Sequence, residues 1–299
     1  MNRFYELQFE IENKCLLDCI HCSSINSRSI ENRRYDNNDI LKMVDLFLGN
    51  IRVIFTGGEP LLYKNILVLC KQISDKLPLS ELEIYTTGNI LNKHYIDILI
   101  AKNLKQSGVK SCYFSIYSQN YKIHDKWTSK QNSFYNTLKS IEFIKSVGIS
   151  PKGHLILNKD NYHDIRDVIY FCESIGIEEI RILKLAPIGN AKTNWDNISI
   201  PLDEQENLIK QLMLYKSEFN VPITIAGYPN LMPCRNISEA KGCQAGSNLL
   251  YINLCGDIYP CACTMNNQDK FRICNIKEID KLKCYLNSVS GFRKECLNK

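Results

Sequence analysis

The sequence predicts an α/β fold, a partial (β/α)6 barrel followed by a small cysteine-rich C-terminal extension. Short apolar runs alternate six times with longer amphipathic segments, which implies a parallel sheet with right-handed crossovers. The alternation ends near residue 190, whereas a complete eight-stranded barrel typically needs ~250 residues. After residue 220, helical periodicity gives way to Gly, Pro, Asn and closely spaced Cys. We therefore divide the chain into residues 1–219, the partial barrel, and residues 220–299, the C-terminal extension.

Each expected strand is a short apolar run, and each expected helix carries apolar residues at helical spacing. The helix expected from Ser133 illustrates the pattern, because Phe134, Leu138 and Ile141 share one face and Gly148 follows its end. In chain order, the expected strands are Phe4–Glu12, Ile51–Phe55, Leu82–Thr86, Ser111–Tyr117, Lys152–Leu157 and Glu179–Leu185. The expected helices are Asn38–Leu48, Lys64–Lys76, Asn92–Asn103, Ser133–Val147, Tyr162–Ile175 and Asp203–Phe219.

The composition is that of a globular protein that works in the cytoplasm. The formal net charge of +5 comes from 37 basic and 32 acidic residues spread along the chain, so we expect no nucleic-acid partner. No apolar run approaches the ~20 residues that cross a bilayer, and the N-terminus lacks a signal peptide. Fourteen cysteines in such a protein indicate metal binding or catalysis rather than disulfides. Cys70, Cys112 and Cys172 lie in apolar segments and are expected in the core.

Three cysteines follow the first expected strand with the spacing C-x3-C-x2-C: Cys15, Cys19 and Cys22. Three thiolates on one loop can hold three irons of a four-iron cluster and leave the fourth iron open to a small ligand. Zinc with His21 as a fourth ligand, or unrelated surface thiols, are the alternatives.

This spacing resembles the radical S-adenosylmethionine (SAM) superfamily, in which the open iron takes the amino and carboxylate groups of SAM. The resemblance implies two cofactors, a [4Fe–4S] cluster and SAM, and reductive cleavage of SAM to methionine and a 5′-deoxyadenosyl radical. It also implies the predicted partial barrel, with the ligand at the carboxyl ends of the strands. The cysteine loop, residues 15–22, follows the first strand and so falls at that end.

Other strand ends resemble the segments with which this family binds SAM. Gly57, Gly58 and Glu59 match the GGEP segment that contacts the SAM amino group, and Thr87 lies where a TNG segment follows the third strand. Ser115 is the candidate for a ribose or carboxylate contact. Tyr117 stands two residues later, where the family often has an acid near the ribose. Ordinary strand–helix turns are the alternative at each of these places.

Two further segments resemble family motifs. His124-Asp125 followed by Ser133-Phe134 is typical of many peptide-modifying members, and His124 has a proton available near neutral pH. Ordering of a loop is the alternative role of His124. The segment Lys184–Ala191 lies where the last strand and its turn cover the adenine, with a linker turn as the alternative.

The arrangement from Cys243 to Cys261 resembles the opening half of a SPASM domain, an extension that binds auxiliary clusters. The extension as a whole resembles the shortened form of this domain, the twitch domain, which has one auxiliary cluster. The resemblance implies an auxiliary [4Fe–4S] cluster on Cys243, Cys261 and Cys296. A hairpin at Gly256 is expected to bring Cys243 and Cys261 together. A structural zinc site is the alternative, and a second auxiliary cluster stays open. The competitors for the fourth place are Cys255, Cys263, Cys274 and Cys284.

Maturation of a ribosomally made peptide, by crosslink or thioether formation, is the leading functional hypothesis. The alternatives are a small-molecule dehydrogenase or carbon-skeleton enzyme of natural-product or cofactor biosynthesis, and a non-enzymatic iron–sulfur or zinc protein. The expected partners are the substrate and an electron donor such as flavodoxin or ferredoxin. Only fourteen residues precede Cys15, so we expect a leader peptide to bind a separate protein or the barrel mouth.

Overall fold

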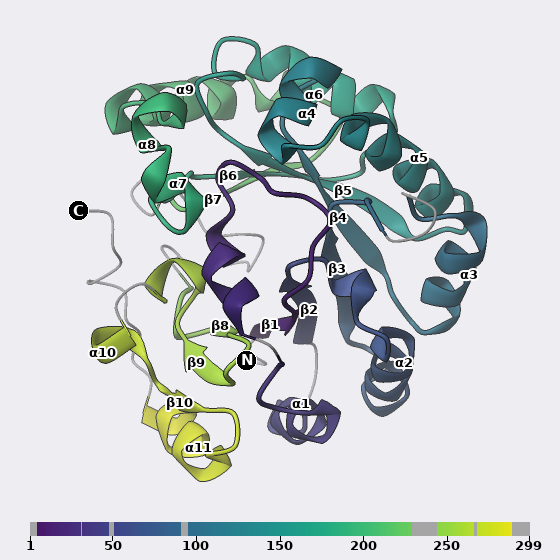
Figure 1. Ribbon diagram of the computed structural model, residues 1–299, viewed down its shortest axis with the longest axis vertical. Coiled ribbons are helices and arrows are strands. Elements are labelled where there is room, and N and C mark those ends of the chain that lie inside the picture. Colours follow the sequence, from purple (N-terminus) through teal and green to yellow (C-terminus); the bar gives the residue numbers. More distant parts are fainter. Residues whose placement is uncertain are drawn as a thin grey trace.

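The computed structural model describes residues 5–30, 32–47, 51–90, 95–228, 244–265 and 268–288. Within these residues, ten strands form one curved sheet in the order β10-β9-β8-β1-β2-β3-β4-β5-β6-β7 (Figure 1). All pairs from β8 to β7 are parallel, and the pairs β8–β9 and β9–β10 are antiparallel. The predicted α/β class and the parallel partial barrel are thus confirmed.

All six predicted strands are present, with ends that differ by one to two residues; Phe4 lies outside the described residues. The structure adds four short strands after residue 220. The strands are β1 Tyr5–Glu12, β2 Ile51–Gly57, β3 Glu81–Thr86, β4 Ser111–Ile116, β5 Ser150–Ile156, β6 Ile180–Leu183, β7 Ile223–Ala226, β8 Leu249–Ile252, β9 Asp257–Tyr259 and β10 Cys274–Asn275.

The six predicted helices correspond to α1, α2, α3, α5, α6 and α9; Leu48 and the predicted start of α3 at Asn92 lie outside the described residues. The helix α4 was not predicted, because its buried residues are a His, a Trp and a Thr rather than an aliphatic stripe. The α-helices are α1 Asn37–Val44, α2 Ile66–Lys76, α3 Ile98–Gln106, α4 Tyr121–Thr128, α5 Ser133–Ser146, α6 Ile165–Ser174, α7 Asn190–Thr193, α8 Trp195–Ile198, α9 Leu202–Leu214, α10 Gln268–Phe271 and α11 Ile279–Ser288. The 3-10 helices are η1 Ser23–Ser29, η2 Pro60–Leu62, η3 Lys216–Glu218 and η4 Ala262–Thr264.

The sheet has an apolar outer face and a polar inner face. Alternate residues of a strand point to opposite faces, so Leu82 and Ile84 of β3 join the main hydrophobic core while Glu81, Glu83 and Tyr85 lie on the other face. Figure 1 shows the helices around the outside of the curve and the chain that leaves β1 inside it. The predicted core thiols lie in this outer core, where all three are buried: Cys70, Cys112 and Cys172.

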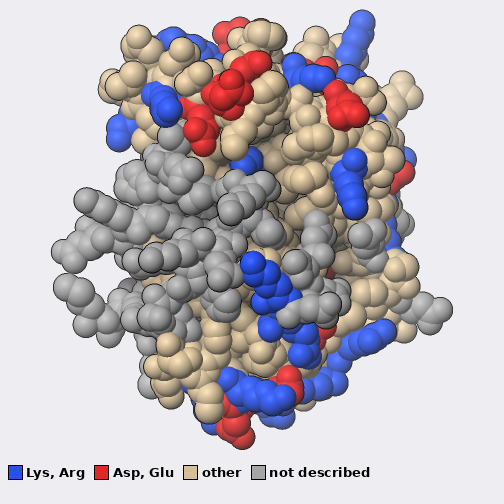
Figure 2. Space-filling view, turned by 90° about the vertical axis from the view of Figure 1, so that its left-hand side faces the viewer, with Lys and Arg blue, Asp and Glu red and all other residues tan. Residues whose placement is uncertain are grey.

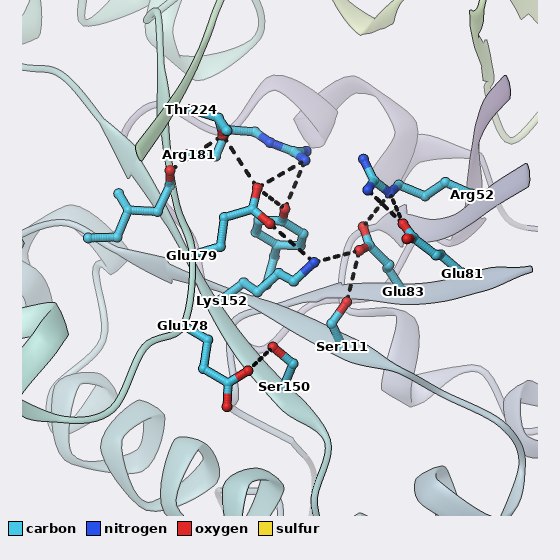
Figure 3. A network of polar contacts seen from close by, with 12 residues as sticks. Arg52, Glu81, Glu83, Ser111, Ser150, Lys152, Glu178, Glu179, Arg181 and Thr224 are labelled. Carbon is cyan, nitrogen blue, oxygen red and sulfur yellow. Dashed lines mark hydrogen bonds and ion pairs between the residues drawn. The ribbon is translucent and has the colours of Figure 1, made fainter. Parts of the chain in front are cut away.

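Near the beginnings of the strands, the inner face is filled by a network of ion pairs and hydrogen bonds (Figure 3). Nζ of Lys152, on β5, lies 3.0 Å from Oε1 of Glu83 on β3 and 3.2 Å from Oε2 of Glu179, which directly precedes β6. The buried Arg181 donates to the hydroxyls of Tyr85 and Tyr113 at 2.6 and 2.8 Å. These side chains pair with one another at this end of the sheet, and the predicted ligand site lies at the opposite, carboxyl ends of the strands.

The sheet continues across the predicted boundary at residue 219. Strand β7 pairs in parallel with β6, and β8 pairs in parallel with β1 through Phe9 and Ile252. The predicted hairpin at Gly256 is confirmed, since β8 and β9 are antiparallel and Gly256 has a φ of 82°. The C-terminal extension therefore shares the barrel's sheet, and its treatment as a separate unit stays a prediction.

Charge is mixed at both ends of one face of the molecule. Figure 2 shows acidic and basic side chains together at both ends of the face that it presents. None of the helices in the described part of the chain is long and apolar enough to cross a bilayer.

Candidate active site

The cysteine loop leaves the carboxyl end of β1 and is held by the end of α4. The Asp18 amide donates to the Thr128 carbonyl at 3.1 Å, and the Ile20 amide donates to the Trp127 carbonyl at 3.0 Å. Within the loop, the Cys22 amide donates to the Cys19 carbonyl. The backbone between the three cysteines is therefore fixed by hydrogen bonds that do not depend on a ligand.

The turn after β6 holds the same loop from the other side. The Asn190 side chain donates to the Cys19 carbonyl at 3.0 Å, and its backbone amide donates to the Cys22 carbonyl at 3.0 Å. The Asn194 side chain donates to the Ile20 carbonyl at 2.8 Å. Gly189 has a φ of 56°, and a Cβ there would lie 2.2 Å from the Cys22 carbonyl oxygen. This turn falls in the segment predicted to cover the adenine, and the structure shows that it fixes the cysteine loop.

Gly57 and Gly58 lie directly against the chain that enters the cysteine loop. A Cβ on Gly57 would lie 2.4 Å from the Glu12 carbonyl oxygen, and one on Gly58 would lie 2.3 Å from that of Lys14. The Gly58 amide donates to Glu12 and the Glu59 amide to Lys14, at 2.8 and 2.7 Å. Only glycine permits this close approach of two backbones, so the Gly-Gly pair packs the end of β2 against the loop.

The Glu59 carboxylate joins the ends of β2 and β3. It accepts hydrogen bonds from the hydroxyls of Thr86 and Thr87 and from the Thr87 amide, all at 2.8 Å. Burial raises the pKa of Glu59, and these donors oppose the shift. Both carboxylate oxygens are thus engaged by the protein, so in this structure Glu59 and Thr87 build the wall of the site together.

The three thiols of the cysteine loop are the candidate cluster ligands. Burial and the neighbouring acid Glu59 raise the pKa of Cys15 to about 11, and burial also raises the pKa of Cys19 and Cys22. Such thiols lose their protons to a metal rather than to water. Within the described residues, no three Cys, His, Asp or Glu side chains converge on one metal ion. A four-iron cluster needs no such convergence, because each thiolate binds a different iron.

His21, the proposed fourth ligand of a zinc site, lies instead in an aromatic cluster. Its ring centroid lies 5.0 Å from that of Tyr117 and 5.4 Å from that of Trp127. Burial lowers the pKa of His21 to about 4, so its imidazole is neutral at pH 7. The described residues around His21 therefore form a packed contact and show no preformed zinc site.

Ser115 lies near the end of β4 and Tyr117 directly follows this strand, beside the cysteine loop. Both lie on the inner face, with Ser115 half-buried and Tyr117 buried. The Tyr117 hydroxyl lies 3.4 Å from Nε2 of His21, and burial raises the pKa of Tyr117. Tyr117 thus contacts His21 of the cysteine loop.

The His124-Asp125 and Ser133-Phe134 motif is a helix cap. The Asp125 carboxylate accepts from the Ser133 hydroxyl at 2.8 Å and from the Phe134 amide at 2.9 Å, which caps the start of α5. His124 is buried between Tyr117 and Phe134, and burial lowers its pKa to about 4. In this structure the His124 imidazole packs against the rings of Tyr117 and Phe134 and is neutral at pH 7.

The candidate ligands of the auxiliary cluster are described only in part. Cys243 and Cys296 lie outside the described residues, and Cys261 is half-buried directly before η4. Among the competitors for the fourth place, Cys274 is buried in the hydrophobic core, whereas Cys263 and Cys284 are exposed and Cys255 is half-buried. Cys274 thus packs as a core thiol.

Several site residues were not predicted from the sequence. Asn190 lies in the segment predicted to cover the adenine, but its contact with the cysteine loop was not predicted, and Asn194 is an ordinary polar residue beyond that segment. Trp127 and Thr128 act through backbone carbonyls, which no residue type signals. Glu10 of β1 is fully buried; it accepts from the Ser27 hydroxyl of η1 and from an amide that follows β8. Alternation on the inner face was the one signal that marked Glu10.

A curved parallel sheet that presents three thiols in a loop after its first strand defines a class of barrel proteins built to hold a metal cluster. The chain belongs to the radical SAM superfamily, whose sequence profile matches residues 9–172, more than half of its length. Membership in this family implies a [4Fe–4S] cluster and SAM as cofactors.

Known relatives act on unlike substrates. An AdoMet-dependent heme synthase of Nitratidesulfovibrio vulgaris is 23% identical over 274 residues, which cover 85% of this chain and 72% of that protein. The antilisterial bacteriocin subtilosin biosynthesis protein AlbA of Bacillus subtilis is 23% identical over 266 residues, 85% of this chain and 54% of that protein. The crystal structure of Streptococcus suis SuiB bound to precursor peptide SuiA has a TM-score of 0.70 at 19% identity, covering 99% of this chain and 68% of that one. This last likeness establishes a shared fold.

Proposed function

We propose that this chain is an enzyme that reductively cleaves SAM and removes hydrogen from an organic substrate. The observation that carries the proposal is the cysteine loop, whose backbone is held at the carboxyl end of β1 by Asn190, Thr128 and the Gly57-Gly58 turn. A [4Fe–4S] cluster bound by Cys15, Cys19 and Cys22 would supply the electron for this cleavage.

The remaining residues of the proposed SAM site bind and orient. Backbone groups of Gly57 and Gly58 would meet the amino end of SAM, because these residues line the strand end next to the loop. Glu59 acts through Thr87, by fixing the shape of the adjacent turn. Ser115 offers a hydroxyl on the inner face. The ion-pair network lies on the inner face at the beginnings of the strands, away from the proposed SAM site (Figure 3).

The proposed substrate is a ribosomally made peptide, in which the enzyme forms a crosslink or thioether. The similarity in fold to a structure that holds a precursor peptide, and in sequence to a bacteriocin biosynthesis protein, supports this class. The capping motif of Asp125 and Ser133, which resembles that of peptide-modifying relatives, also supports it. A small-molecule substrate in cofactor or natural-product biosynthesis is the second candidate, favoured by the similarity to a heme synthase.

We further propose that the C-terminal extension, residues 220–299, is a twitch-type unit that binds an auxiliary [4Fe–4S] cluster through Cys243, Cys261 and Cys296. The Gly246 amide, three positions after Cys243, donates to the Pro260 carbonyl next to Cys261 at 3.2 Å, which supports a shared site. Such a cluster would accept an electron from the product or bind substrate. Flavodoxin or ferredoxin would reduce the enzyme, and a leader peptide would bind a separate protein or the barrel mouth.

Anaerobic reconstitution with iron and sulfide tests the cofactor assignment. We expect about eight irons per chain and formation of 5′-deoxyadenosine from SAM and reductant, as two four-iron clusters require. Alanine at Cys15, Cys19 and Cys22 should remove about four irons and all SAM cleavage. The matched control, Cys70→Ala, removes a core thiol and should keep both. Persistent cleavage in the triple variant would refute the assignment of the cysteine loop.

The substrate class is tested by searching beside this gene for one that encodes a short peptide rich in Cys or aromatic residues, and by using that peptide as substrate. Incubation with the reconstituted enzyme, SAM and reductant should give a peptide that has lost hydrogen and carries a new bond in tandem mass spectra. If the peptide stays unmodified while the enzyme converts a porphyrin precursor or a nucleotide, the small-molecule substrate class replaces the peptide class.

A further inference from the structure

The Arg28 side chain reaches from η1 back to the cysteine loop. Its Nη2 donates to the Leu17 carbonyl at 2.6 Å, and its Nη1 lies 3.3 Å from Oδ1 of Asp18. The Leu17 carbonyl and the Asp18 amide belong to one peptide unit, and this amide donates to the Thr128 carbonyl at 3.1 Å. The peptide unit lies between the first two cysteines of the loop. A guanidinium holds its carbonyl, and the end of α4 holds its amide.

The positive charge of Arg28 lies close to the candidate cluster ligands. Leu17 is two residues from both Cys15 and Cys19, so the bonded Nη2 lies within about 12 Å of the α-carbons of both. The Arg28 side chain is 26% exposed, whereas that of its partner Asp18 is 70% exposed. Water screens an exposed carboxylate more than a largely buried cation. The ion pair therefore leaves much of the positive field of Arg28 inside the loop.

The guanidinium also has a donor that the protein does not use. Nε of Arg28 is buried and has no hydrogen-bond partner among the described residues. A buried donor without an acceptor is unfavourable, and the sulfur atoms of a cluster on this loop are acceptors that carry negative charge. The surroundings of Arg28 thus fit an anionic group bound by the cysteine loop.

We propose that Arg28 is a positioning residue for the cluster, whose guanidinium fixes the Leu17–Asp18 peptide unit and whose charge raises the reduction potential of a cluster on the cysteine loop. The inference rests on the proposed function, because it assumes a cluster on this loop. The reductant transfers one electron to the cluster and so adds one negative charge, which a fixed cation nearby stabilises. Arg28 thus sets how readily the enzyme accepts its electron.

The test compares the wild-type holoprotein with the Arg28→Gln variant in redox titrations followed by electron paramagnetic resonance. The signal to follow is the one that alanine at the three cysteines of the loop abolishes. Glutamine keeps a polar side chain without the charge, so we expect a more negative potential. The matched control is Arg166→Gln, which removes the same charge from an exposed pair with Glu218 on the outer helix α6 and should leave the potential unchanged.

Two further variants test the sign of the effect. Arg28→Lys keeps the charge, so its potential should stay close to that of the wild-type protein. Asp18→Asn removes the carboxylate that opposes the cation, so its potential should be less negative. Because Asp18 is exposed, this variant also decides the question if the Arg28 variants bind no cluster.

Hydrogen exchange at the Asp18 amide separates position from charge, because it reports how firmly the peptide unit is held. Exchange should become faster in both Arg28→Lys and Arg28→Gln, whereas only Arg28→Gln should shift the potential strongly. Equal shifts of potential in these two variants would refute the role of the charge. Potentials of Arg28→Gln and Asp18→Asn equal to that of the wild-type protein would overturn the inference and leave the proposed function intact. A wild-type protein that holds no cluster on the cysteine loop would overturn both.

Discussion

The Glu59 carboxylate accepts two hydrogen bonds from Thr87, one from its amide and one from its hydroxyl, each at 2.8 Å. These bonds connect the Gly-Gly turn after β2 to the turn after β3, on the side of the cysteine loop. Glu59 was expected to contact a cofactor, but its carboxylate oxygens accept hydrogen bonds from the protein. It therefore affects a ligand by fixing the position of the two turns.

Replacement of Glu59 by Gln should destabilise the fold. The amide nitrogen would face Thr donors and leave buried groups without acceptors, so we expect the free energy of unfolding to fall by about 1–3 kcal/mol. Urea denaturation measures the change, with Glu142→Gln on the exposed face of α5 as the control. Equal stabilities of the Glu59 and Glu142 variants would argue against the role given to this carboxylate.

Asp125→Ala removes the cap of α5 and loosens the cysteine loop. Loss of the bonds to Asn132, Ser133 and Phe134 should lower the free energy of unfolding by about 1–2 kcal/mol. Because α4 holds the Asp18 amide, hydrogen exchange at Asp18 should become faster. The exposed Asp167 of α6, changed to Ala, is the control. Unchanged hydrogen exchange at Asp18 would show that the cap of α5 does not stabilise the cysteine loop.

Gly189→Ala should lower the iron content after reconstitution, because its Cβ would lie 2.2 Å from the Cys22 carbonyl oxygen. Gly148→Ala is a matched control, since Gly148 has a φ of 73° but its Cβ would meet only the end of Lys105, 3.7 Å away. Both variants carry the backbone strain of a positive φ, and only the first displaces the cysteine loop. Equal iron in the two would mean that this contact is not needed for cluster binding.

Buried His124 should make the fold sensitive to acid. Its pKa falls from 6.5 to about 4 in the folded state, so between these values the unfolded chain binds the proton and the folded protein does not. Stability from this group is complete above pH 6.5 and decreases as the pH falls, by up to roughly 3 kcal/mol at about pH 4.

Urea denaturation of the wild type and of His124→Asn between pH 7 and pH 4 measures this contribution. The variant should lose less stability on acidification than the wild type, although it is less stable at pH 7. The exposed His163, changed to Asn, is the control and should follow the wild type. Parallel pH curves for His124→Asn and the wild type would contradict the predicted shift.

Arg181→Met should disrupt the network of Figure 3. The buried guanidinium donates to Tyr85 and Tyr113 and lies 3.9 Å from Glu179. Removal of one partner from a buried charged network costs roughly 3–5 kcal/mol. Arg166→Met breaks an exposed pair with Glu218 and should cost at most about 1 kcal/mol. Similar losses in thermal denaturation of the two variants would show that the buried network contributes little.

The elements of the fold could be predicted from the sequence because each is recorded in a local pattern. Residues of β3 alternate between the apolar outer face and the polar inner face, and helix α5 carries its apolar residues at helical spacing. The cysteine spacing likewise belongs to one short loop. Elements without such a pattern were not predicted. One of them is α4, whose buried face consists of His124, Trp127 and Thr128.

The sequence by itself thus determined the six strand–helix units, the glycines that end β2 and the three thiols after β1. Only the tertiary structure decided what holds those thiols. The Asn190 side chain reaches the Cys19 carbonyl across 171 positions of sequence, and β8 pairs with β1 although most of the chain lies between them. Hydrophobic periodicity reports that a residue is buried, but not which distant residue covers it. The partners of the cysteine loop are backbone carbonyls and amide side chains, whose pairing depends on where the folded sheet brings them.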